Sequence, residues 1–192
     1  MPRFLERLRL LVPQLPLLIS MSMNAALLYA TLPLLDVSFD EARLKDKLQL
    51  ISESTDADVY NLWQVHVASN DRHYIASIVR DEADRPVVDE FGRSATAQPF
   101  SKVITAAGVT AMLGGNSMCE GVEDVIAPLP LTQTLRQKIN AKHVCFIPVR
   151  NARNEMIGYV ALIWKQDRTA DDLLAQVTIV RGILQKSTSP WD

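Results

Sequence analysis

A long uncharged stretch lies near the N-terminus of this chain. From Leu10 to Leu35 the sequence LLVPQLPLLISMSMNAALLYATLPLL contains no Asp, Glu, Lys or Arg. A helix that crosses the hydrocarbon core of a bilayer needs about 20 mostly apolar residues. A helix on the surface of a soluble domain would instead carry a charged face. We therefore predict a transmembrane helix over residues 10–35.

Two alternatives to this span stay open. The segment NAALLYA imitates the small-residue cleavage site of a secretory signal peptide, although the apolar region of such a peptide is only about 7–15 residues long. The stretch could also be a buried or interfacial helix, because polar residues dilute it. Pro13, Pro16 and Pro33 lie near its ends, where a helix tolerates proline.

The charges beside the stretch predict its orientation. Arg3, Arg7 and Arg9 precede it, whereas the first charged residues that follow it are acidic. An excess of Arg and Lys marks the cytoplasmic side of a membrane helix. We expect residues 1–9 to be a short cytoplasmic arm. Residues 36–192 should form a domain beyond the inner membrane, in the periplasm of a Gram-negative cell.

Three polar residues share one side of the predicted span. At 100° per residue, Ser20, Asn24 and Thr31 fall within about 40° of one another. Small and polar side chains mediate association between membrane helices, so we expect this stripe to be the packing or lumen face of a self-associating helix. The alternative is a weakly hydrophobic anchor whose hydroxyls bond to their own backbone.

The two cysteines, Cys119 and Cys145, have no metal-ligand spacing. In an oxidising compartment such as the periplasm they could form a disulfide. Two buried free thiols are the alternative, because a sequence does not supply the bond geometry.

The composition of the 192-residue chain is that of a globular protein. Hydrophobic residues make up 48% and charged residues 22%, which argues against a disordered chain. The formal net charge is −2 and no basic patch is visible, which argues against nucleic acid as a partner.

The hydrophobic pattern predicts a helix at each end of the domain. Residues 38–54 form an amphipathic helix, in which Ser38 and Glu41 make a capping box. Residues 169–186 form another, capped by Thr169. Between them, four strands in two hairpins are predicted: 58–69 with 73–82, and 143–151 with 156–166.

The middle of the domain is predicted to be less regular. We expect a loop over 83–100, a short helix over 101–113, irregular chain from Gly114 to Pro130, and a short helix over 131–140. The whole is an α+β domain with an antiparallel sheet and packed helices.

No residues in the sequence form a recognisable active site. His66 and His73 flank the first turn and could meet, but a metal site needs three or four ligands. Trp63, Tyr74 and Trp164 lie on predicted strands and either pack in the core or line a pocket. We predict no enzymatic activity, no metal and no cofactor.

The chain closes with the strand VCFIPV, a turn, the strand IGYVALIW and an amphipathic helix. This ending resembles a GAF domain, within the wider GAF/PAS-type sensory layout. It implies a sensory or regulatory module that binds a small ligand or a partner.

The predicted span is followed by two long stretches, KLQLISESTDADVYNLWQVHVASNDRHYIASIVRDEADRP and CFIPVRNARNEMIGYVALIWKQDRTADDLLAQ. With these stretches, the whole layout also resembles the holins of T-even-type phages, which have one membrane helix and a globular periplasmic domain. It implies monomers that gather in the inner membrane and open lesions, with the periplasmic domain as a timer that can bind an antiholin. The disulfide of that family uses a Cys in the last helix, and here Thr169–Lys186 has none.

The main functional prediction is therefore a holin-like protein of host cell lysis. The alternatives are a membrane-tethered GAF/PAS-like sensory or regulatory module without enzymatic activity, or a structural subunit of a membrane or virion assembly. The predicted partners are membrane lipid, further copies of the chain, and an antiholin or other regulatory protein.

Overall fold

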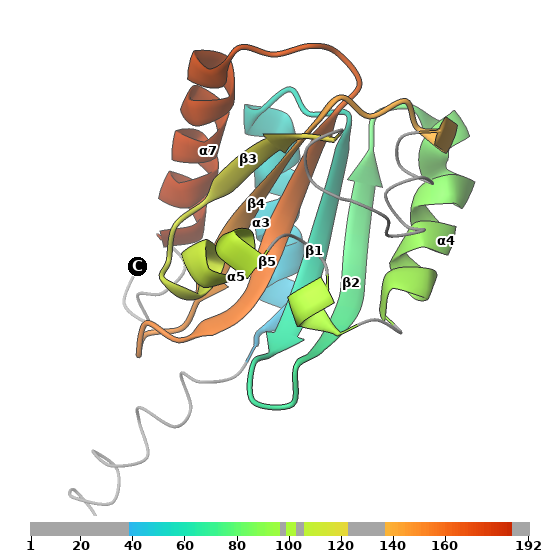
Figure 1. Ribbon diagram of the computed structural model, residues 1–192. Helices are drawn as coiled ribbons and strands as arrows, with labels where there is room; N and C mark the ends of the chain where they lie inside the picture. Colours follow the sequence, from blue (N-terminus) through green and yellow to red (C-terminus); the bar gives the residue numbers. More distant parts are fainter. Residues whose placement is uncertain (1–38, 97–98, 103–105, 123–136, 186–192) are drawn as a thin grey trace, which may run out of the picture. The chain divides into compact units, whose positions relative to one another are not determined.

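The computed structural model describes residues 39–96, 99–102, 106–122 and 137–185 (Figure 1). Three sets of residues from the sequence analysis lie outside these ranges: the span 10–35, the topology charges (Arg3, Arg7, Arg9) and the polar stripe (Ser20, Asn24, Thr31). None of the helices in the described ranges is long and apolar enough to cross a bilayer. The span and its orientation therefore stay predictions.

Five antiparallel strands form one sheet in the order β2-β1-β5-β4-β3. The strands are β1 (Val59–His66), β2 (Asp71–Val79), β3 (Met118–Gly121), β4 (His143–Arg150) and β5 (Met156–Trp164). Both predicted hairpins are confirmed. Pairing of β1 with β5 joins the two hairpins into one sheet, which buries nearly every residue of these two strands on both faces.

Two helices cover one face of the sheet, α3 (Glu41–Ser54) and α7 (Ala170–Gln185). As predicted, α3 buries Leu44, Leu48 and Ile51, which recur at helical spacing. The two helices run antiparallel. Lys47 Nζ, in the middle of α3, donates to the Ile183 carbonyl near the end of α7 at 2.9 Å, whereas the backbone N–H of Asp56, just after α3, donates to the Gln176 side chain in the first half of α7.

The opposite face carries α4 (Arg85–Thr96), α5 (Ala106–Leu113) and the short 3-10 helices η2 (Glu82–Asp84) and η3 (Phe100–Lys102). The prediction of a loop over 83–100 was wrong, since α4 occupies most of this segment. The helix is hard to recognise in the sequence because Pro86 and Gly92 look like helix breakers. Pro86 lies in the first helical turn, where a missing N–H costs nothing. Val88 and Ala95 are fully buried on the sheet side of α4.

One smaller prediction also needs correction. The predicted irregular segment contains β3, an edge strand of 4 residues that is too short to show an alternating pattern. Of the helix predicted over 101–113, the structure describes η3 up to Lys102 and α5 from Ala106 to Leu113, and residues 103–105 lie outside the described ranges. Most of the helix predicted over 131–140 lies outside the described ranges.

The helix ends are capped by local side chains. In α3 the cap is Asp40 rather than Ser38: its carboxylate accepts from the Arg43 N–H at 3.0 Å. In α7 the predicted cap is confirmed, because Thr169 Oγ1 accepts from the Asp172 N–H while the Asp172 carboxylate accepts from the Thr169 hydroxyl and N–H.

Candidate ligand-binding site

The candidate site lies where β4 extends beyond its edge neighbour β3. The register between the two strands ends at the pair Met118–Phe146, whereas β4 continues to Arg150. The last residues of β4 therefore have no strand partner on this side within the described ranges. Pro148 lies in this free segment, and proline is tolerated at such an edge because it has no N–H to donate.

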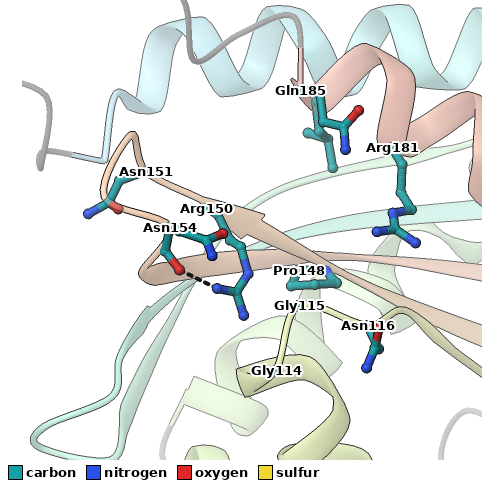
Figure 2. Close-up of a pocket in the computed structure, with 10 residues that line it drawn as sticks. Gly114, Gly115, Asn116, Pro148, Arg150, Asn151, Asn154, Arg181 and Gln185 are labelled. Carbon is teal, nitrogen blue, oxygen red and sulfur yellow. Dashed lines mark hydrogen bonds between the residues drawn. The ribbon is translucent and has the colours of Figure 1, made fainter.

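A pocket of about 360 Å³ lies at this edge (Figure 2). Its walls come from three parts of the chain: the turn after α5, the β4–β5 hairpin and the C-terminal end of α7. The lining residues are Gly114, Gly115, Asn116, Pro148, Arg150, Asn151, Asn154, Arg181, Leu184 and Gln185.

Arg150 links two of these walls. Its guanidinium donates to the carbonyl oxygens of Met112 (3.3 Å) and Leu113 at the C-terminal end of α5, and to that of Asn154 in the hairpin turn. Gly115 lies directly under this side chain, because a Cβ there would be 3.0 Å from Arg150 Nε. The φ of +89° at Gly115 also favours glycine, so the turn and the arginine depend on each other.

The hairpin wall is held by Asn151, which is 6% exposed. Its side-chain oxygen accepts from the N–H groups of Arg153 (3.0 Å) and Glu155 (2.9 Å), and its amide donates to the Glu155 carboxylate. This arrangement fixes the turn that presents Asn154, whose φ is +63°.

The pocket has a strongly basic lining. Arg181 is exposed on α7 and extends toward the edge of the sheet, on the side where Pro148 and Asn116 lie (Figure 2). None of the described lining residues is Asp or Glu. Neither Arg150 nor Arg181 forms an ion pair with a carboxylate in the part of the chain that the structure describes.

The three residues predicted to line a pocket do not come together. Trp63 and Tyr74 are neighbours, with ring centroids 5.3 Å apart, but Trp164 lies in the core cluster on the other face of the sheet. Of the two alternatives, core packing is therefore the one that the structure shows for Trp63 and Trp164, on opposite faces of the sheet. Trp63 is 1% exposed and stacks on Tyr159, so it is a core residue.

Arg72 enters this aromatic cluster from β2 and is 2% exposed. Its Nε donates to the Ala95 carbonyl at 2.9 Å, and its Nη1 donates to the Tyr159 hydroxyl at 3.1 Å. The guanidinium also lies 4.7 Å from the centre of the Trp63 ring, a cation–π contact. Because Ala95 is in the last turn of α4, the positive charge meets the negative end of that helix and fastens it to the sheet.

Two further groups of titratable residues have structural roles. Burial raises the pKa of the Tyr159 hydroxyl, and the adjacent Arg72 partly opposes that shift. Lys165, at the end of β5, pairs with Asp84 and its pKa is raised chiefly by that carboxylate. The backbone N–H of Lys165 also donates to the Asp58 carboxylate at 2.7 Å. The ion pair between Lys165 and Asp84 therefore ties η2 to the end of β5.

His66 and His73, which the sequence analysis considered as a pair, lie across the β1–β2 hairpin with ring centroids 5.5 Å apart. Both are exposed, which is the solvent-facing placement typical of strand histidines. Within the described ranges, no group of three His, Cys, Asp or Glu side chains could hold a metal ion.

The structure joins Cys119 and Cys145 in a disulfide. The two residues are directly opposed in the register of β3 and β4. The bond therefore fastens the short edge strand β3 to the sheet, three residues after the Gly115–Asn116 wall of the pocket.

Sequence reasoning did not identify the pocket residues as a site. Its walls come from segments that are far apart in the chain, and none of them carries a ligand-binding motif. The GGN after α5 and the NARN turn after β4 were visible, but only as turns.

Solved structures similar to this one are GAF domains and related sensory domains. One is the GAF domain/HD domain protein from Geobacter sulfurreducens, with a TM-score of 0.52, 14% identity, and coverage of 76% of this chain and 89% of that one. Another is a domain from Sinorhizobium meliloti 1021 assigned to a two-component sensor histidine kinase, with a TM-score of 0.52, 14% identity, and coverage of 78% and 90%. A red/green cyanobacteriochrome in its red-light-absorbing state has a TM-score of 0.52, 12% identity, and coverage of 76% and 92%.

The fold of the described residues is thus GAF-like, as the resemblance of the closing hairpin and helix predicted. No protein-family model matches the sequence, and no curated protein is similar enough to be a relative. The resemblance to phage holins gains no support from these comparisons.

Proposed function

We propose that this chain is a regulatory binding module without enzymatic activity, tethered to the inner membrane by residues 10–35. The observation that carries the proposal is a polar pocket in a GAF-like domain, one wall of which is the terminal helix α7. Sensor proteins among the similar structures use the same fold, which supports a signalling role.

Because α3 packs on α7, a movement of α7 at the pocket would be passed to α3. Arg181 lines the pocket, and two residues later the Ile183 carbonyl accepts a hydrogen bond from Lys47 of α3. A shift of α7 on ligand binding would therefore move α3 as well. A module of this kind acts by changing its association with a partner protein or with further copies of the chain.

The tether is tested by fusing alkaline phosphatase after Asp192 and expressing the chain in a Gram-negative cell. The phosphatase folds only when it is exported, so the proposal predicts an active enzyme that sediments with the membranes. Deleting Leu10–Leu35 should leave it inactive in the cytoplasm. An inactive fusion of the intact chain, or an active fusion in the soluble periplasmic fraction, would contradict the proposed tether.

A further inference from the structure

The charges around the β4-edge pocket are unbalanced. Two guanidinium groups and four carboxamide side chains line it, and none of its described lining residues is acidic. The chain as a whole has a formal net charge of −2, so this excess of positive charge is local to the pocket.

Arg150 is held in place by hydrogen bonds, and no carboxylate in the described ranges pairs with its positive charge. Within the described ranges, the three hydrogen bonds of its guanidinium go to neutral backbone carbonyls, and its Nε–H is buried without an acceptor. A guanidinium in this situation gains from a nearby anion, because only part of its hydrogen-bonding capacity and none of its charge is matched. Its position is fixed before any ligand arrives, since Gly115 supports it from below.

Arg181 reaches the same pocket from a different element. It extends from the exposed side of α7, and its guanidinium has no ion-pair partner within the described ranges (Figure 2). Planar guanidinium groups bind carboxylate and phosphate oxygens through paired hydrogen bonds, which lysine does not reproduce.

The remaining lining narrows the ligand class. A volume of about 360 Å³ is that of a site for a metabolite-sized molecule. Pro148 and Leu184 are the apolar contributors, whereas the carboxamides of Asn116 and Asn154 offer both donors and acceptors. Such walls match hydroxyl and carbonyl groups better than a lipid chain or a large aromatic ring.

We infer that this pocket binds a small polar organic anion through Arg150 and Arg181, the anionic group being a carboxylate or a phosphate. The inference rests on the proposed function, since it names the ligand class of the same site. Binding would draw α7 toward the β4–β5 hairpin, because Arg181 and Arg150 would share one anion.

The test is calorimetric titration of the full chain in lipid nanodiscs with two probes, citrate and inorganic phosphate. We expect saturable binding of at least one probe. Binding of citrate alone identifies a carboxylate site, and binding of phosphate alone identifies a phosphate site. Arg181→Gln should weaken the binding at least roughly tenfold, because it removes a charge-assisted pair of hydrogen bonds. Arg181→Lys should recover only part of the loss.

The matched control is Arg153→Gln, which removes the same charge from an exposed residue that does not line the pocket. It should bind the probes like the wild type. Equal weakening of binding in Arg181→Gln and Arg153→Gln would show that the loss of any one positive charge explains the effect, which would contradict a specific role of Arg181. If neither citrate nor phosphate binds saturably to the wild type, the inference is overturned. Either failure leaves the phosphatase result intact, so it is distinguishable from failure of the proposed tether.

Discussion

Reduction of the Cys119–Cys145 disulfide should destabilise the domain by a predictable amount. The bond closes a loop with a sequence separation of 26. The loss of chain entropy in the unfolded state for a loop of that length corresponds to about 3.5 kcal/mol at 25 °C. Reduction leaves both sulfur atoms in place between β3 and β4, so native packing changes little and most of the effect should come from the unfolded chain.

The assay is urea unfolding of the full chain, followed by tryptophan fluorescence with and without a dithiol reductant. With a denaturant slope of about 2 kcal/mol per molar urea, we expect the midpoint to fall by nearly 2 M on reduction. The double variant Cys119→Ala/Cys145→Ala serves as the control, and its urea midpoint should not change when the reductant is added. The reasoning fails if the wild-type midpoint stays unchanged after thiol titration shows that both cysteines are free. Alkylation of untreated exported protein should find no free thiol, and labelled cysteines there would contradict the disulfide itself.

Three other substitutions test the packing and the electrostatics. Gly92→Ala should lower the free energy of unfolding by about 1–3 kcal/mol, because its Cβ would lie 2.7 Å from the Tyr74 ring; an unchanged thermal midpoint would show that the ring moves aside freely. Gly182→Ala should raise the free energy of unfolding by about 0.5–1 kcal/mol, since a Cβ there meets no atom within 4 Å and alanine is the better helix former; a loss of stability in the same melt would contradict the open face of α7. The hydroxyl and the N–H of Thr169 hold the pKa of Asp172 below its ordinary value. The stabilising effect of this contact is therefore present above the unfolded-state pKa and is lost as the pH falls through the folded-state pKa. Thr169→Val removes the hydroxyl and should raise that pKa toward the ordinary value, as measured by a carboxyl-carbon NMR titration; an unmoved titration curve would show that the cap does not shift it.

The sequence predicted the elements whose hydrophobic pattern is long and regular. Both hairpins and the helices α3 and α7 were recognised because period-2 and period-3.6 patterns extend over many residues. The helix α4 was missed, because Pro86 and Gly92 obscure a pattern whose buried positions are clear only in the packed structure. The strand β3 was missed because 4 residues carry no period.

The face of the sheet on which a side chain lies depends on the register between strands, which the sequence alone does not show. Trp63 lies opposite Tyr159 in the register of β1 and β5, so the two share a face. Trp164 is an odd number of residues beyond Tyr159 along the same strand, which sends it to the other face. The pocket at the β4 edge depends in the same way on where β3 stops, and only the three-dimensional register shows that.

Induced expression of the intact chain in a Gram-negative cell, with culture density and membrane potential followed together, distinguishes the proposed tethered binding module from a protein that opens the membrane. For the tethered module we expect steady growth and a constant potential while the intact protein accumulates in the membrane fraction. An abrupt depolarisation after a delay, abolished by deleting Leu10–Leu35, would contradict it and favour the lysis function.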